Sequence, residues 1–292
     1  MKGKRYTLTT SLTISGGLSM DINYFEQIWS KKNTDKTACQ SFWDGRAEEF
    51  NLRKQKNERD KRLDSVLKLF ATKEMLKEDG NILDIGCGPG MYSIEFAKRA
   101  KSVIGTDISP KMIEFARENA QAEGLNNASF DTLDWEMVDL KALGWEKKFD
   151  LVFASMTPAI NSKTTLEKMV QASKGFCFVS TFVNRRDSVR DRLTSLLNGP
   201  GTLRDFSKTI YCGFNILWLM GFYPEITYLD TEWENTYSLE KAVTLYNAYY
   251  EMTHPLNKAQ KEHLNAYLEE ISENGQIKEK IEAKVAWMYW KI

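Results

Sequence analysis

The sequence predicts an α/β protein built on a doubly wound, mostly parallel sheet. Residues 82–85 form a short apolar run, followed by three alternating glycines and an amphipathic segment. This pattern is typical of a buried parallel strand, a tight turn and a helix. Short apolar runs and helical segments then alternate up to residue 183, as in sheets covered by helices on both faces. With 292 residues, 42% of them hydrophobic, the chain can form one large domain with additions.

The composition excludes several classes of protein. Lys+Arg and Asp+Glu both number 40, so the chain has no general basic field for nucleic acid. No CxxC pair occurs among the scattered cysteines, which predicts neither a zinc site nor a disulfide framework. These cysteines are Cys39, Cys87, Cys177 and Cys212. We expect a reducing, cytoplasmic location and no membrane span, because no apolar run is long enough.

We expect the chain to divide into three parts. The first twenty residues are rich in Thr, Ser and Gly and lack a continuous apolar stretch, so they predict a flexible extension rather than a signal peptide. A helical segment should follow, and then the main domain with two helical additions. The expected bounds are 1–20, 21–79 and 80–292, with additions at about 184–222 and 238–275.

The glycine-rich turn suits a cationic ligand. Glycine accepts positive φ and has no Cβ to keep a ligand away from the backbone. No Lys follows Gly90 as a P-loop requires, and Met91 stands where a dinucleotide fingerprint needs its third glycine. The carboxylate of Asp84 at the strand end favours a positively charged ligand over a pyrophosphate.

The D-x-G-x-G-x-G pattern of residues 84–90 resembles the class I S-adenosylmethionine (SAM) methyltransferases. The resemblance covers about residues 40–183. It implies a seven-stranded sheet whose last strand inserts antiparallel between the fifth and sixth, and it implies SAM as cofactor with S-adenosylhomocysteine as product. It also implies that the turn holds the charged methionine end of SAM through Asp84, Gly86, Cys87, Gly88 and Gly90.

A second strand, Val103 to Thr106, ends at an acid. Asp107 lies seventeen positions past Gly90, close to the offset at which a ribose-binding acid follows a glycine loop. Its carboxylate can accept hydrogen bonds from both ribose hydroxyls, and Ile108 would then lie against the adenine. Ser109 and Pro110 predict the start of the next helix.

The resemblance implies further cofactor contacts after the third and fourth strands. An acid is expected to accept from the adenine amino group, with the next residue against the ring edge; Asp134 and Trp135 match best, and Asp131 is an alternative. Ligands bind outside the carboxyl ends of parallel strands, so Ser155 and Thr157 should line the site. The loop lacks the Asn/Asp-Pro-Pro-Tyr/Phe motif of amino-methylating DNA enzymes, which argues against base methylation.

The remaining elements follow from caps, breakers and alternation. Thr164 and Glu167 are spaced as a capping box that opens a helix. Strands and helices should then follow one another to the end of the chain. The expected strands are 175–183, 225–233 and 284–291, and the expected helices are 187–197, 204–220, 238–252 and 257–274.

Candidate acceptor-binding residues come from two segments. The resemblance implies that a W-x-x-R-A segment ahead of the core lies over the SAM pocket as a lid, so that Trp43 and Arg46 border the active site. Tyr211, Asn215 and Trp218 share one helix face, which is either core or pocket lining. We include Tyr211 and Asn215, together with Thr157, among the predicted substrate-binding residues.

No catalytic residue is assigned with a clear preference. The sulfonium of SAM already activates the methyl group, so the enzyme has to align a nucleophile and exclude water. A base is needed only for some acceptors; Tyr92, Asp191, Tyr211 and Glu234 are candidates. With two histidines and no suitable carboxylate cluster, no metal site is predicted.

The sequence therefore predicts a SAM-dependent methyltransferase that acts on a small molecule. A protein or RNA methyltransferase is an alternative, although basic residues gather only in two stretches, 54–62 and 185–192. A SAM-binding regulatory protein without turnover is another, and a dinucleotide oxidoreductase fits the glycine spacing least. The acceptor and the oligomeric state stay open.

Overall fold

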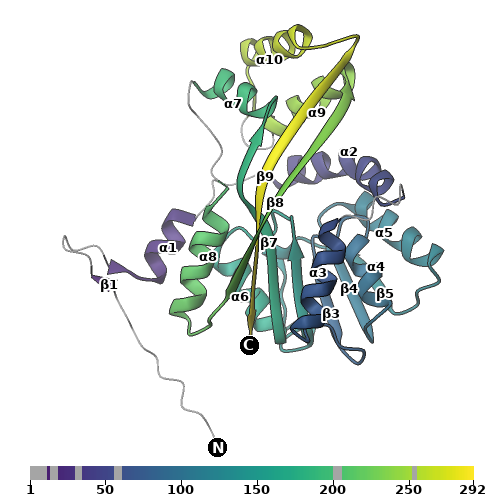
Figure 1. The fold of residues 1–292 in the computed structure, drawn as a ribbon, viewed down its shortest axis with the longest axis vertical. Helices are drawn as coiled ribbons and strands as arrows, with labels where there is room; N and C mark the ends of the chain where they lie inside the picture. Colours follow the sequence, from purple (N-terminus) through teal and green to yellow (C-terminus); the bar gives the residue numbers. More distant parts are fainter. Residues whose placement is uncertain (1–11, 14–18, 30–34, 56–60, 200–205, 252–254) are drawn as a thin grey trace, which may run out of the picture.

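A seven-stranded mixed sheet forms the centre of the protein in the computed structural model (Figure 1). The structure describes residues 12–13, 19–29, 35–55, 61–199, 206–251 and 255–292. Strand β9 is antiparallel to both of its neighbours, and the other adjacent pairs are parallel. The predicted fold class is thereby confirmed. In sheet order the strands are β5 Ala128–Thr132, β4 Ser102–Asp107, β3 Asn81–Ile85, β6 Phe149–Ser155, β7 Ser173–Asp187, β9 Gln276–Lys291 and β8 Glu225–Ser238.

Helices cover both faces of the sheet because successive strand residues point to opposite sides. On β3, Leu83 and Ile85 join one apolar core and Ile82 joins the other. The core of Leu83 includes side chains from α1 (Ile22–Trp29), α6 (Lys163–Ala172) and α8 (Lys208–Leu219). The core of Ile82 includes side chains from α3 (Lys61–Thr72) and α4 (Met91–Ala97), and α5 (Pro110–Ala122) packs beside α4.

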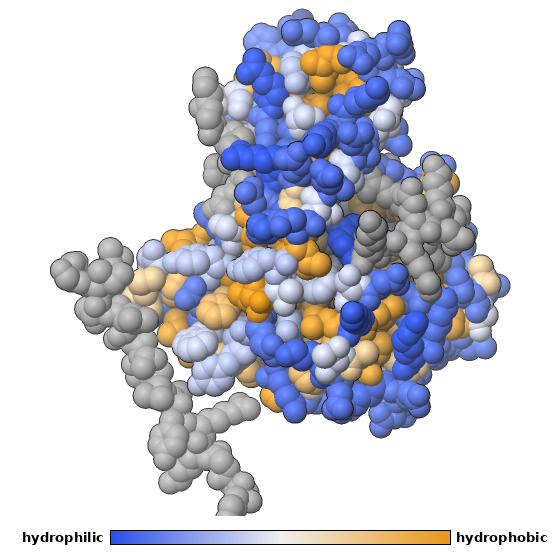
Figure 2. Space-filling view, viewed as in Figure 1, coloured by the Kyte–Doolittle hydropathy of each residue, from blue (hydrophilic) through white to orange (hydrophobic). Residues whose placement is uncertain are grey.

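The last three strands of the sheet are about three times as long as β3. Their extended ends carry α7 (Arg190–Asn198), α9 (Leu239–Glu251) and α10 (Lys258–Glu270), a unit that we call the cap (Figure 1). The cap has its own apolar core, with Leu193, Tyr246, Leu264 and Leu268 fully buried. Hydrophilic side chains cover most of its visible surface (Figure 2).

The cap helices lie close to their predicted positions, but the strands are longer than expected. The predicted strands 175–183, 225–233 and 284–291 extend to 173–187, 225–238 and 276–291. The first half of β9 alternates buried and exposed residues, and Glu279 occupies one of the buried positions. A carboxylate in an inward position obscures the alternation that marks a strand.

The N-terminal segment, expected to be helical over 21–79, contains three helices. Between α1 and α3 lies α2 (Lys36–Gln55). Most of the predicted flexible extension lies outside the described residues, apart from a short pairing of β1 (Leu12–Thr13) with β2 (Ser19–Met20). No helix in the described ranges is long and apolar enough to cross a membrane.

The capping box of α6 differs from the predicted one. Ser162 rather than Thr164 is the N-cap: its hydroxyl accepts from the backbone N–H of Thr165, whose Oγ1 accepts from the N–H of Ser162. The predicted capping box paired Thr164 with the side chain of Glu167. A threonine hydroxyl three residues after the cap performs the same exchange, so the helix begins earlier than expected.

Candidate functional site

The turn after β3 requires its glycines. Gly86, Gly88 and Gly90 have φ values of +69°, +54° and +83°, a region that other residues rarely adopt. A Cβ on Gly86 would lie 2.1 Å from Oγ1 of Thr157. A Cβ on Gly88 would meet only the sulfur of Met112, at 3.9 Å. The turn is therefore closed against the next loop at Gly86 and open to a ligand at Gly88.

Asp84 and Asp107 place two carboxyl groups beside this turn. Asp84 is 2% exposed and accepts a hydrogen bond from the hydroxyl of Ser93. Burial, with a contribution from the charge of Asp107, raises the pKa of Asp84 to about 7 against the opposing hydrogen bond from Ser93. A buried carboxylate is costly without a cationic or hydrogen-bonding partner, so the site favours a positively charged ligand.

Asp107 connects the end of β4 to the turn. Its Oδ2 accepts from the backbone N–H of Gly88 at 3.0 Å, and its Oδ1 accepts from the N–H of Ser109 at 2.9 Å. Burial raises its pKa, although these two hydrogen bonds oppose the shift. Ile108 contributes a further backbone hydrogen bond. Because a carboxylate accepts about four hydrogen bonds in all, acceptor capacity remains for a ligand. Ile108, next along the chain, is partly buried.

Polar residues hold helix α2 against helix α5 and the glycine turn. Asp44 accepts hydrogen bonds from the hydroxyl of Ser109 and from the N–H of Lys111 at the start of α5. The amide of Asn119 donates to Asn51 at 2.8 Å and to the carbonyl of Pro89 in the glycine turn at 3.0 Å. The sequence interpretation missed Asp44 and Asn51, because polar residues in a charged helix resemble a solvated face.

The two residues predicted on this helix lie on its aromatic side. Trp43 contacts Phe42 and Phe50, with ring centroids 5.2 and 6.1 Å away. The guanidinium of Arg46 lies 4.9 Å from the ring centroid of Phe50 and donates to Glu49 at 3.0 Å. Both belong to the helix whose Asn51 is linked to the glycine turn through Asn119; their predicted role in a lid stays a prediction.

The loop after β6 borders the glycine turn. Ser155 pairs with Ser180 of β7, and the N–H of Met156 donates to the carbonyl of Ser180 at 2.8 Å. Met156 has a φ of +55°, which is uncommon for a residue with a long side chain. Thr157 packs directly against Gly86. Such strained positions cluster at functional sites.

The acids predicted near the adenine differ in their surroundings. Asp134 accepts from the N–H of Glu136 at 3.0 Å and from Nζ of Lys36, in α2, at 2.6 Å. The alternative acid, Asp131, has a side chain that is 63% exposed. Trp135 is buried in the core, and its Nε1 donates to the carbonyl of Thr165 at 3.0 Å. Of the two acids, Asp134 is the one tied to α2.

The remaining candidates are dispersed. Tyr211 and Asn215 line a different hollow, together with Val183, Phe214 and Tyr228, to which no predicted cofactor residue contributes. Glu234 is exposed on the extended part of β8. Tyr92, by contrast, follows the glycine turn directly, and its ring lies 4.9 Å from that of Phe153. Within the described residues, no group of His, Cys, Asp and Glu is suited to hold a metal ion.

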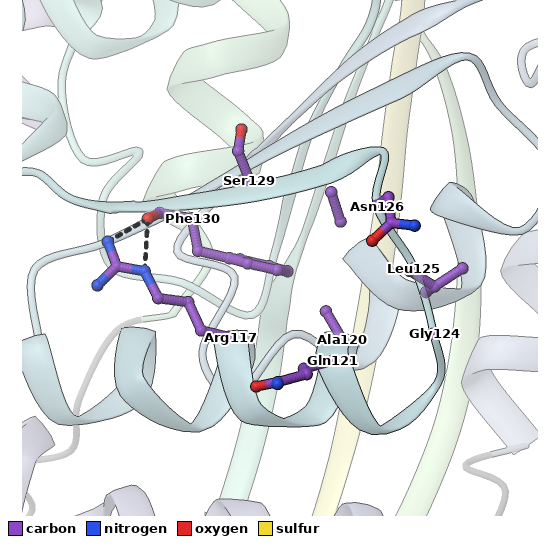
Figure 3. Close-up of a pocket in the computed structure, with 9 residues that line it drawn as sticks. Arg117, Ala120, Gln121, Gly124, Leu125, Asn126, Ser129 and Phe130 are labelled. Carbon is purple, nitrogen blue, oxygen red and sulfur yellow. Dashed lines mark hydrogen bonds between the residues drawn. The ribbon is translucent and has the colours of Figure 1, made fainter.

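The hollow drawn in Figure 3 lies between α5 and the edge strand β5. Its only charged lining residue, Arg117, donates from Nε and Nη2 to the carbonyl of Phe130 (Figure 3). None of the predicted cofactor residues lines it. The candidate functional site is therefore the surrounding of the glycine turn beneath α2.

Residues 76–216 match the family model described as a methyltransferase domain. The chain is 38% identical over 96 residues to the 23S rRNA (uracil(1939)-C(5))-methyltransferase RlmD of Shewanella sediminis, covering 32% of this chain and 22% of that protein. The same enzyme of Pseudoalteromonas translucida is 30% identical over 162 residues, covering 53% and 32%. The chain thus spans no more than about a third of these relatives' length.

Solved structures with a similar course of the chain include two methyltransferases. A putative methyltransferase from Bacillus halodurans is 14% identical, covers 78% of this chain and 97% of its own, and has a TM-score of 0.49. Magnesium protoporphyrin IX methyltransferase from Synechocystis, with bound S-adenosylhomocysteine, is 15% identical, covers 90% and 92%, and has a TM-score of 0.45.

Proposed function

Since residues 76–216 match a methyltransferase-domain model, we propose that this chain is a SAM-dependent methyltransferase that methylates a small molecule bound beneath α2 and the cap. The observation that carries the proposal is the position of α2. This helix is tied to the glycine turn through Asn51 and Asn119 and contacts the cap where Phe42 meets Tyr249, with ring centroids 6.0 Å apart. Because α2 covers the glycine turn and contacts the cap, the site suits a small acceptor better than a polymer.

The residues around the turn fit SAM. The backbone at Gly88 is open to the methionine part, and the buried carboxyl of Asp84 suits its ammonium group. The remaining acceptor positions of Asp107 suit the ribose hydroxyls, and Asp134 is the acid assigned to the adenine amino group. When bound, SAM supplies a methyl group that its sulfonium already activates. We assign to the chain the tasks of holding the acceptor in line and excluding water.

Acceptor residues follow from the same geometry. Thr157 and the strained Met156 lie beside the turn, and Trp43 and Arg46 belong to the helix above it. Tyr92 is the base candidate nearest to the turn in the chain, and its hydroxyl would serve only an acceptor that has to lose a proton before transfer. We assign no role in acceptor binding to Tyr211, Asn215 and Glu234, because they lie away from the glycine turn.

Binding of SAM should strengthen as pH rises through about 7. A carboxylate attracts the ammonium group only when ionised, and the pKa of Asp84 is raised to about 7 by burial. Calorimetry between pH 6 and pH 8 should show affinity falling by up to about tenfold per unit below that pKa. Asp84→Asn should remove this dependence, and an unchanged slope in the variant would exclude Asp84 as its source.

In the absence of SAM, Asp84 should make the free energy of unfolding depend on pH in the opposite direction. The unfolded chain loses the proton of Asp84 near pH 4, whereas the folded chain keeps it until about pH 7. The folded state therefore binds more protons in this interval, and its free energy of unfolding should fall as pH rises. Denaturant titrations of the wild type and Asp84→Asn between pH 4 and pH 7 measure this contribution.

Methylation of RNA is the second candidate function. It is favoured by the relationship to enzymes that methylate 23S rRNA, which are matched over a minor part of their length. The basic stretch 185–192, which would favour RNA if exposed, has Arg185 and Arg190 largely buried, and their side chains are 12% and 14% exposed. The stretch 54–62 lies largely outside the described residues.

Transfer of label from methyl-labelled SAM distinguishes methylation of a small molecule from methylation of RNA. The purified protein is incubated either with a metabolite extract freed of macromolecules or with total RNA from cells lacking the protein. We expect label in a small product, formed more slowly by Asp107→Ala when SAM is below saturation. Label incorporated into RNA alone would refute the small-molecule proposal.

A further inference from the structure

Two buried arginines at the base of the cap share a single carboxylate. Nη2 of Arg185, on β7, lies 2.9 Å from Oδ2 of Asp187, and Nε of Arg190, on α7, lies 3.7 Å from the same oxygen. The other oxygen of Asp187 accepts from the backbone N–H groups of Val189 and Arg190. Asp187 is 2% exposed, so its acceptor capacity is largely used within the protein.

The nearby acid does not balance the second guanidinium. Glu279 is also buried, and its carboxyl group accepts hydrogen bonds from the hydroxyl of Tyr246 and the amide of Asn235. Burial and the adjacent Asp187 raise the pKa of Glu279, which disfavours its charged form. Burial and the charge of Arg190 lower the pKa of Arg185. Of the two buried acids, only Asp187, whose pKa is lowered, thus stays ionised beside the two guanidinium groups. A third acid, Asp191, accepts from the backbone N–H of Asp187 at 3.2 Å.

Donor groups of both arginines remain without acceptors. In the part of the chain that the structure describes, Nε of Arg185 and Nε of Arg190 are buried and meet no hydrogen-bond acceptor. Buried donors in folded proteins are nearly always paired, and an unpaired charged donor is especially costly. An oxyanion would supply acceptors that match the planar edge of a guanidinium.

Aromatic rings hold both guanidinium groups in place. Arg185 lies 5.2 Å from the ring centroid of Phe182 and 5.4 Å from that of Trp233. Arg190 lies 4.4 Å from the ring centroid of Tyr249, which also contacts α2 through Phe42. Stacking engages the faces of a guanidinium and leaves its N–H edges for hydrogen bonds. The arginines are therefore preorganised for an anion.

The cluster lies on the strand that leads away from the methyl-transfer site. Ser180 of β7 accepts from Met156 beside the glycine turn, and Arg185 is five residues further along the strand. At about 3.3 Å per residue the separation is at most about 16 Å. One acceptor molecule can therefore reach from the turn to the arginines if it is elongated.

We propose that Arg185 and Arg190 bind an oxyanion group, carboxylate or phosphate, of the methyl acceptor. The assignment to the acceptor depends on the proposed function, whereas the anion site itself does not. The expected acceptor is an elongated small molecule with the anionic group at one end and the methylated atom near the other.

Anion binding is measured on the whole protein by calorimetry at constant ionic strength, with inorganic phosphate and with acetate as probes. Arg185→Gln and Arg190→Gln should each weaken binding of the preferred probe by about tenfold or more. Arg186→Gln is the matched control, because this neighbour on the same strand is exposed; it should bind as the wild type does. Equal affinities in Arg185→Gln and Arg186→Gln would overturn the anion site. The probe that binds more tightly distinguishes phosphate from carboxylate.

A second measurement uses the unmodified protein, in case the variants misfold. Phenylglyoxal labelling, read by mass spectrometry of peptides, should be slowed at Arg185 and Arg190 by the bound anion and unaffected at Arg186. Equal labelling with and without both anions would overturn the site. SAM affinity should be unchanged in the Arg185→Gln variant. If Arg185→Gln loses anion binding but the wild type forms no small methylated product, the proposed function is refuted and the anion site is retained.

Discussion

Replacing Gly86 with alanine should abolish measurable SAM binding and lower the free energy of unfolding by several kcal/mol. The φ of +69° disfavours alanine by about 1–2 kcal/mol. The added Cβ would also lie 2.1 Å from Oγ1 and 2.5 Å from Cβ of Thr157, and forced overpacking adds about 1–3 kcal/mol. Relief of this clash has to displace the turn or the Met156 loop, both of which border the proposed cofactor site.

Gly144→Ala is the matched control for this prediction. Gly144 has a similar φ of +61°, but a Cβ there would meet nothing within 4 Å. Denaturant unfolding should therefore show only the conformational part of the loss, with SAM binding intact. The double variant Gly86→Ala/Thr157→Gly should recover part of the stability, since it removes both clashing atoms. Equal losses in the two alanine variants would contradict the proposed contact.

Asp107→Ala should weaken SAM binding by about 1–3 kcal/mol, which is roughly fivefold to 150-fold. The change removes the acceptor of two ribose hydroxyls, and it also releases the N–H groups of Gly88 and Ser109. Asp131→Ala is the control, because this acid stands at the adjacent position of the neighbouring strand and is largely exposed. Calorimetry should find the control unchanged; wild-type affinity in Asp107→Ala would remove Asp107 from the site.

The sequence was sufficient to predict the sheet and the cofactor turn because local patterns determine both. Continuous apolar runs mark parallel strands buried on both faces. The spacing of Gly86, Gly88 and Gly90 specifies backbone conformations that only glycine adopts readily, and all three have positive φ. Asp107 could be proposed as a site residue because it stands between a strand end and a helix cap.

The cap and its charged cluster depend on contacts between distant segments, which one sequence does not reveal. The predicted strand ends at residue 183, yet β7 continues to Asp187, and the side chains of Arg185 and Asp187 are largely buried beside Glu279, more than ninety residues away. Buried charges of this kind contradict the usual rule of polar residues outside. Asp44 and Asn51 escaped notice for a related reason, since their partners Ser109 and Asn119 lie in another helix.

The central claim is that the turn of residues 84–90 holds SAM. Calorimetry on the whole protein with SAM, S-adenosylhomocysteine and NAD tests it most directly. We expect SAM and S-adenosylhomocysteine to bind with dissociation constants of about micromolar order, a binding free energy of roughly 8 kcal/mol, and NAD to give no heat of binding. Tight binding of NAD with none of SAM would contradict the account.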